Sequence, residues 1–267
     1  ILISQTGGGC RASNYIGFIR RALEKAGYPN VPVISINLSG LESNPGFTFT
    51  PKLIQHGLYA LEFGDIFLRC LYATRPYEAV PGSANELHAK WKKKIIAFIT
   101  QDKILSHKKY KQMCREIIRD FDNLPRLDIK KPRVGVVGEI LVKFHPAANN
   151  YLADLLESEG AEAVVPDLTD FLLYCFYNSN FKAEHLGMKK STARLCNAGI
   201  ALLEFFRKTA RKELAASKHF TPPSEIRDLA EMAKGFVSLG NQTGEGWLLT
   251  GEMIELIHNG ASNIVCC

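Results

Sequence analysis

The sequence predicts an α/β protein made of two Rossmann-like units with parallel sheets and a helical insert. Three observations carry this prediction. A strand, a glycine-rich turn, a helix and a second strand follow one another near the N-terminus, and a similar order recurs after residue 132. Between them lies a long stretch with helical periodicity and no clear strand. Because such crossovers build parallel sheets, we expect a first unit with the insert over 1–123 and a second unit over 133–267.

The first unit begins with an apolar segment, Ile1–Ser4, that can end a strand. A glycine-rich turn follows, and Ala12–Ala26 then has helical periodicity with apolar residues on one face. Gly27 is a typical helix stop, and Val31–Ile36 is a short apolar strand. Strand, turn, helix and strand within so few residues indicate a βαβ unit.

The insert is helical over three stretches, which either cover the sheet or form a separate cap. These stretches are Leu53–Tyr72, Ala84–Ile99 and His107–Phe121. A linker is expected over 122–132, because Pro125 and Pro132 terminate helices on either side.

The second unit opens with the β-branched strand Arg133–Gly138. A helix is predicted over Pro146–Glu159, with Gly160 as its stop, and a strand over Ala163–Val165. Further helices and a last strand are predicted over Asp170–Tyr177, Thr192–Lys212, Ser224–Phe236, Gly246–His258 and Asn263–Val265.

Composition excludes several classes of protein. A chain of 267 residues that is 46% hydrophobic and 22% charged can bury a core and is not disordered. The net charge of +6 sits largely in lysine runs, which indicate solvated faces first and attraction of phosphate or coenzyme A second. Since no aromatic residues interleave the basic runs, we expect no nucleic-acid partner.

We expect a cytoplasmic protein with no membrane partner. No signal peptide is visible. The longest apolar stretch contains Glu62, Asp65 and Arg69, and such charges are costly in hydrocarbon. The start at Ile1 and the end just after an apolar run lead us to expect a piece of a longer chain, truncated at the C-terminus of its second unit.

Loops at the carboxyl ends of parallel strands gather at the edge where open α/β folds bind ligands. Three segments should lie there: Thr6–Arg11, Gly138–Pro146 and Cys266-Cys267. We therefore expect thiols from both units to face one cleft.

The turn with Gly7, Gly8, Gly9, Cys10 and Arg11 is the most informative segment. Glycines allow close backbone approach, and a following helix start favours an anion and a thiolate. Three interpretations stay open: a cluster ligand or reactive thiol, a phosphate-binding turn with an incidental cysteine, and a structural turn. The segment is neither a Walker A loop nor a dinucleotide fingerprint.

Two other loops carry candidate polar groups. Glu139 could act as a general base beside His145, or both could belong to a solvated loop. Asn241, Gln242 and Thr243 could bind a ligand carbonyl or phosphate, or form a capping turn. Lys143 is a further polar group of the first loop.

The seven cysteines do not form a disulfide framework, because their number is odd, their spacing is wide and no CxxC pair occurs. Cys70, Cys114, Cys175 and Cys196 lie on helical stripes and are expected in the core. Adjacent cysteines rarely bind one metal together, so only one of the final pair should act as a ligand.

Three segments together resemble the 2-hydroxyacyl-CoA dehydratase family, and specifically the C-terminal dehydratase-like region of its large activase-related proteins. They are Thr6–Tyr15 with Val33–Asn37, Val134–Glu139 with His145–Asn150, and Leu239–Trp247. The resemblance covers nearly the whole chain. It implies Rossmann-like subunits that hold an iron–sulfur cluster, [4Fe–4S] or another type, and that work anaerobically.

The resemblance also implies a function and partners. In that family an ATP-dependent activator delivers one low-potential electron, and the dehydratase removes water from an (R)-2-hydroxyacyl-CoA by a ketyl-radical route, while some relatives are reductases. Cys10 would be a cluster ligand, and Cys266 or Cys267 another. An electron-transfer domain is the first interpretation. A catalytic dehydratase subunit (a lyase) that binds acyl-CoA and a non-catalytic scaffold are the alternatives, and a homodimer is one arrangement open to the chain.

The sequence departs from that family in two ways. The phosphate loop of the actin-like activator is missing, so we expect no ATP hydrolysis by this chain. Only two ligand positions are seen, whereas a cubane takes about four. The others would come from a missing segment, a partner chain or an internal cysteine.

Overall fold

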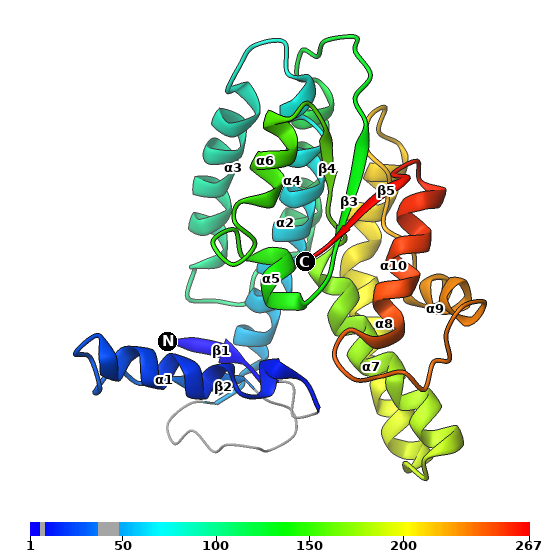
Figure 1. Cartoon of the computed structure of the whole chain (residues 1–267). Helices are drawn as coiled ribbons and strands as arrows, with labels where there is room; N and C mark the ends of the chain where they lie inside the picture. The colour runs from blue at the N-terminus through cyan, green and yellow to red at the C-terminus, as the bar shows by residue number, and fades with distance from the viewer. Residues whose placement is uncertain (6–8, 37–47) are drawn as a thin grey trace.

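The computed structural model describes residues 1–5, 9–36 and 48–267, which form ten α-helices, two 3₁₀ turns and two small parallel sheets (Figure 1). The α-helices are α1 Tyr15–Lys25, α2 Pro51–Tyr72, α3 Ser83–Ile99, α4 His107–Asp122, α5 Ile140–Phe144, α6 Leu152–Ser158, α7 Leu168–His185, α8 Lys190–Ala215, α9 Ile226–Lys234 and α10 Gly246–His258. The sequence-based prediction of an α/β protein is confirmed at this level.

The first sheet has two parallel strands, β1 (Leu2–Ser4) and β2 (Ile34–Ile36), joined by α1. The predicted βαβ order is therefore present. Helix α1 begins later than expected, because a 3₁₀ turn over Arg11–Ser13 intervenes after the glycine-rich turn. In Figure 1 this small unit lies apart from the second sheet, next to the N-terminal end of α2.

The second sheet has the strand order β4–β3–β5, and all its strands are parallel. The central strand β3 covers Arg133–Val137, with β4 (Glu162–Val164) on one side and β5 (Asn263–Cys266) on the other. Because β3 lies in the middle, its carboxyl end and that of β5 emerge side by side.

The insert packs onto the second sheet rather than standing apart. Helix α2 contacts β4, α7 and α8, and α4 packs along α8. The largest hydrophobic cluster joins α2, α3 and α4 to Ala210 and Leu214 of α8. At its centre the rings of Tyr59 and Tyr110 stack at 4.1 Å between centroids. The insert was predicted as part of the first unit, but its helices pack on β4, α7 and α8 of the second.

The segment after β3 differs from the prediction. A short helix, α5, occupies part of the expected loop, and the helix expected over Pro146–Glu159 is reduced to α6. Asn149 explains the break, because its Nδ2 donates to Val142 O at 2.9 Å and its Oδ1 accepts from Leu152 N at 3.1 Å. One side chain thus ends α5 and begins α6.

The exposure of two cysteines also differs from the prediction. Cys70 and Cys114 are fully buried, as expected. Cys175 is exposed on α7 and Cys196 is half-buried on α8. Among the described residues, no helix combines the length and apolar character that a bilayer span requires.

Candidate functional site

Three segments that are distant in sequence meet around Glu139. We call this region the crevice, after the cleft that the sequence predicts here, and define it by the contacts of Glu139. Glu139 is buried and caps α5 by accepting a hydrogen bond from Val142 N at 3.0 Å. Its other carboxylate oxygen accepts a hydrogen bond from the hydroxyl of Tyr15, which belongs to the first unit. Its backbone N–H donates to Cys267 O at 3.0 Å. One residue therefore links the first unit to the last strand.

Gly138 makes the close approach of the chain end possible. Its φ is +136°, and a Cβ atom there would lie 1.9 Å from Cys267 O. Cys267 continues the pairing of β5, since its N–H donates to Val137 O at 2.9 Å. Only glycine fits a position that combines this backbone conformation with such contact.

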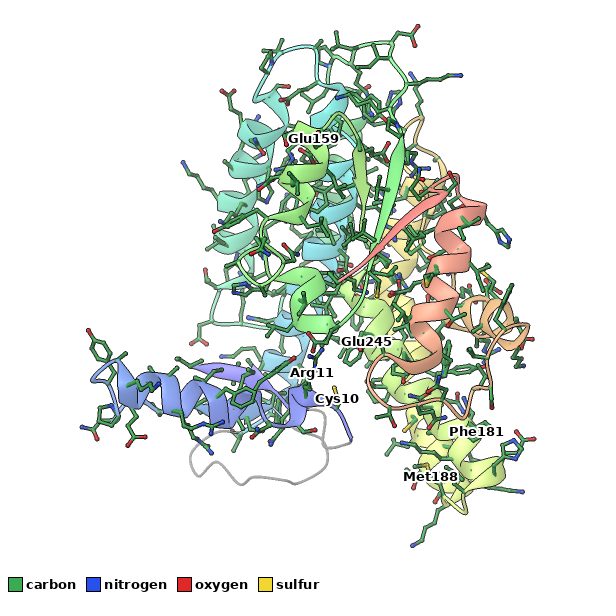
Figure 2. All side chains as sticks on the ribbon, viewed as in Figure 1. Cys10, Arg11, Glu159, Phe181, Met188 and Glu245 are labelled. Carbon is green, nitrogen blue, oxygen red and sulfur yellow. The ribbon has the colours of Figure 1, made fainter. Side chains whose placement is uncertain are left out.

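The N-terminal side of the crevice contains the glycine-rich turn. Cys10 is half-buried, and its carbonyl accepts from Ser13 N at 3.1 Å at the start of the 3₁₀ turn. A Cβ on Gly9 would lie 3.3 Å from Cγ2 of Thr243, so the turn adjoins the loop before α10. Figure 2 shows Cys10 and Arg11 on the side of the first unit that faces Glu245. Gly7 and Gly8 lie outside the described residues.

Tyr15 shows how closely the two units approach. Burial and the hydrogen bond to Glu139 raise the pKa of Tyr15 to about 12, and the nearby Cys10 thiol adds to the rise. The Glu139 carboxylate is thus held by a neutral phenol on one oxygen and a backbone N–H on the other. Each oxygen can accept a further hydrogen bond, so the general-base role of Glu139 stays a prediction.

The loop before α10 is held mainly by its own polar groups. Gln242 Nε2 donates to Leu239 O at 2.9 Å, and Asn241 O accepts from Trp247 N at 2.8 Å. Glu245 accepts from Ile140 N at 2.6 Å and so ties the loop to α5. Of the three predicted ligand-binding residues, Gln242 has its side-chain nitrogen bonded within the protein, whereas Asn241 and Thr243 are exposed, and ligand binding by this loop stays a prediction.

A third thiol lies on the α7 side of this region, and the sequence did not indicate it. Cys175 has solvent-exposed surface, but the protein around it disfavours the thiolate, and this desolvation, with a smaller contribution from Cys10, raises its pKa to about 12. Tyr174, its neighbour on α7, donates to Gly244 O at 3.1 Å. Cys266 and His145 are exposed, whereas Cys267 is half-buried with its thiol 3.4 Å from Val137 O.

The described residues do not gather into a preformed metal site. No group of three or more His, Cys, Asp or Glu side chains in residues 1–5, 9–36 and 48–267 has a geometry that could hold an ion. The thiols are the right ligand type for an iron–sulfur cluster, but they are spread around the crevice. They fit part of a ligand set.

A second polar site, which we call the buried charge cluster, was missed by the sequence prediction. Asp167 follows β4 and bridges two arginines, with Arg69 NH2 at 2.7 Å from one carboxylate oxygen and Arg207 NH2 at 2.9 Å from the other. Arg207 also pairs with Asp170 at 2.7 Å. Asp65 accepts hydrogen bonds from the backbone N–H groups of Leu168 and Thr169 and so caps α7 from a different helix.

The members of this cluster carry opposite pKa shifts. Burial acts to raise the pKa of Asp167, but Arg69 and Arg207 hold it below its ordinary value. Burial raises the pKa of Asp65 to about 6, and the charge of Asp167 adds to the rise. Burial also raises the pKa of Glu62 well above its ordinary range. Burial also raises the pKa of Asp170, although Arg207 opposes this rise. Of these four carboxyls, only Asp167, which pairs with two arginines, has a lowered pKa.

The sequence did contain a signal for the cluster. Glu62, Asp65 and Arg69 are spaced by three and four residues, which places them on one face of a helix. Charges on one face of an otherwise apolar, buried helix indicate internal partners. Asp167 also follows a predicted strand, as the crevice residues do.

Lys143, expected as a polar group of the cleft, is buried instead. Its Nζ lies 2.9 and 3.0 Å from the two carboxylate oxygens of Glu252, and both side chains are 1% exposed. The side chain joins α5 to α10 and does not reach the crevice as a free cation.

Comparison with family models, with curated proteins and with solved structures finds no match.

Proposed function

We propose that this chain is a cytoplasmic, iron–sulfur-cluster-binding, electron-transfer domain of a protein related to the 2-hydroxyacyl-CoA dehydratases and their activases, built on two Rossmann-like units. The observation that carries the proposal is the link through Glu139. This residue accepts from Tyr15 of the first unit and donates to Cys267 at the chain end. Thiol-bearing segments from both units therefore border one crevice.

The residues that would hold the cluster are Cys10 and one of the two final cysteines. Cys175 is a third thiol beside Cys10. Thiolates are the usual ligands of iron–sulfur clusters, and a cubane takes about four. Further ligands would come from a partner or from residues outside the described part of the chain. A bound cluster would accept and pass on single electrons at low potential.

The charged groups around these thiols support the electron-transfer role. Both oxygens of Glu139 already accept hydrogen bonds, and Lys143 is paired internally. Arg11 is exposed at the crevice, where its charge would favour an anionic cluster or thiolate. The expected electron donor is an ATP-dependent activator, and a catalytic dehydratase subunit that binds acyl-CoA remains the second candidate on the sequence resemblance alone.

The test is anaerobic reconstitution with iron and sulfide, followed by iron and acid-labile sulfide assays and visible absorption. The wild-type chain should bind both elements and absorb broadly, and Cys10→Ser should lose most of the iron without unfolding. Cys196→Ser is the matched control, since Cys196 is half-buried on α8 outside the crevice. Equal iron content in wild type and Cys10→Ser, or no cluster in any variant, would contradict the proposal.

A further inference from the structure

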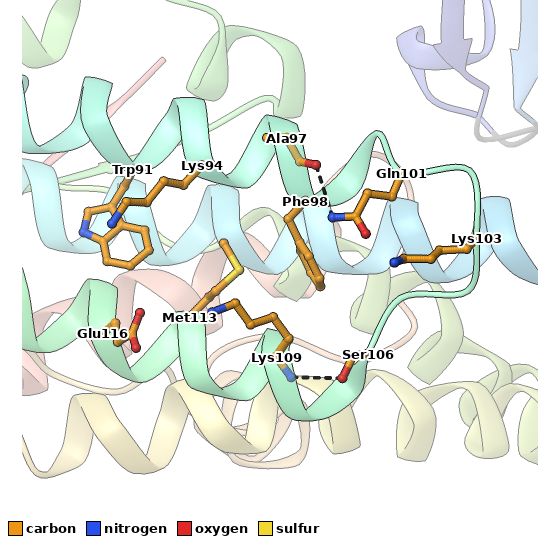
Figure 3. A pocket seen from close by; sticks show the side chains of 10 residues that line it. All are labelled: Trp91, Lys94, Ala97, Phe98, Gln101, Lys103, Ser106, Lys109, Met113 and Glu116. Carbon is orange, nitrogen blue, oxygen red and sulfur yellow. Dashed lines mark hydrogen bonds between the residues drawn. The ribbon is translucent and has the colours of Figure 1, made fainter.

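A groove of about 540 Å³ lies between α3 and α4, away from the crevice (Figure 3). Its floor contains the buried side chains Trp91, Phe98 and Met113. Its rim carries Lys94, Lys103 and Lys109, all of which are exposed. Figure 3 shows Lys103 reaching toward Phe98 from the connecting loop and Lys109 lying along α4 toward Met113. The groove thus combines an apolar floor with a cationic rim.

The charge of the chain is concentrated around this groove. The segment Ser83–Asp122 has ten Lys or Arg and five Asp or Glu, a formal net charge of +5 out of the chain's +6. Packing of α3 against α4 explains the shape of the groove, because their apolar faces meet at its floor. Their lysines therefore remain on the rim.

Two acidic side chains lie close to the rim in sequence. Asp102 pairs with Lys52 of α2. Glu116 lines the groove beyond Met113 and accepts from Gln112 at 2.7 Å, so the three rim lysines outnumber the one carboxylate of the lining. Lys94 places its ammonium 4.1 Å from the centroid of the Trp91 ring. That contact places a cation against the aromatic part of the floor.

We infer that this groove binds a planar organic anion of nucleotide size, with its ring against the apolar floor and its anionic groups at the three rim lysines. The volume lies within the range of small-molecule sites, about 300–1,000 Å³. Lysine ammoniums pair with phosphate, sulfonate or carboxylate oxygens through charge-assisted hydrogen bonds. The inference is independent of the cluster proposal, because the groove and the crevice share no residue.

The experiment uses two probes: adenosine diphosphate by isothermal titration calorimetry, and 1-anilinonaphthalene-8-sulfonate by fluorescence with nucleotide displacement. The wild-type chain should show one saturable site for each probe, and the two should compete. Replacing Lys94, Lys103 and Lys109 together by Gln should weaken binding by about tenfold or more, because charge-assisted hydrogen bonds are lost.

Two matched controls distinguish binding in the groove from attraction by the overall positive charge of α3 and α4. Lys90, Lys93 and Lys108 lie on the same helices, are exposed and do not line the groove, so their joint change to Gln removes equal charge and should leave binding within about threefold. Ala97→Glu places a carboxylate on the groove wall and should abolish binding. Ala89→Glu, on the same helix outside the groove, should not.

Three results would overturn the inference. Equal weakening in the two triple variants would mean that diffuse charge attracts the probes. Displacement by inorganic phosphate as effective as that by the nucleotide would mean that the ring is not recognised. If neither probe binds saturably, the groove is not a small-molecule site. The same conclusion follows if only an acidic peptide binds there.

Discussion

The crevice and the buried charge cluster occupy equivalent places in the fold and have opposite characters. Both lie at the carboxyl ends of strands in the three-stranded sheet, the crevice after β3 and β5 and the cluster after β4. The crevice borders half-buried and exposed thiols. The cluster contains carboxyls and arginines that are nearly all buried and paired with one another.

The difference comes from what covers each strand end. Helix α2 packs against β4, and its Asp65 caps α7, so the end of β4 is sealed by side chains from three helices. The ends of β3 and β5 face the small first unit and are joined to it through Glu139 and Tyr15. Position at the carboxyl edge is therefore not sufficient for an open site, because a covering helix can turn the same edge into core.

The largest expected effect is a loss of stability when the buried charge cluster is changed. Arg207→Met removes the shared partner of Asp167 and Asp170 and leaves buried carboxylates without it, which should lower the free energy of unfolding by about 3–5 kcal/mol. Equilibrium urea unfolding measures the change. Lys208→Met, an exposed neighbour on α8 with the same charge change, should cost less than about 1 kcal/mol. Equal losses would mean that the cluster is not a buried network.

A smaller loss of stability is expected for a substitution at Gly138, in the crevice. Gly138→Ala should lower the free energy of unfolding by about 2–3 kcal/mol, because its φ is +136° and its Cβ would meet Cys267 O. Gly160→Ala is the matched control, since Gly160 has φ +86° and nothing within 4 Å of a Cβ. Its cost should be about 1 kcal/mol. Similar costs in a urea titration would show that the chain end does not pack against Gly138.

The smallest effect is a pH dependence of the cluster. Burial raises the pKa of Glu62 well above its ordinary value of 4.5. The folded protein therefore keeps a proton that the unfolded chain loses, and this carboxyl contributes less to stability as the pH rises above about 4.5.

In the Glu62→Gln variant the side chain is neutral at every pH. Its contribution to stability therefore does not fall as the pH rises. The stability of the variant relative to wild type should increase between pH 5 and pH 8, by at most about 1.4 kcal/mol per pH unit. Urea midpoints measured across this range test the prediction. The control Glu24→Gln, exposed on α1, should give a difference from wild type that does not change with pH. A pH-independent difference for Glu62→Gln as well would contradict a buried neutral carboxyl.

Much of the secondary structure was predictable because it depends on local patterns. The helices of the insert, α10 and the strand at Arg133 lie within a few residues of their predicted places. Helix α5 was missed, because five residues are too few to show a period and its cap comes from Glu139. Cys175 was assigned to the core because nearly every position of Phe171–Tyr177 is apolar or aromatic, so periodicity does not identify an outer face there.

The sequence by itself determined the kind of elements, the turn glycines and the presence of thiols after strand ends, since each depends on residues within a few positions of one another. Only the tertiary structure decided which strand end is open and which is sealed. It also paired Tyr15 with Glu139 and Asp167 with two arginines from different helices. Those pairings join residues that are about 40 to 124 positions apart in sequence. Which of these residues meet depends on how helices and sheets pack, and local periodicity does not encode that packing.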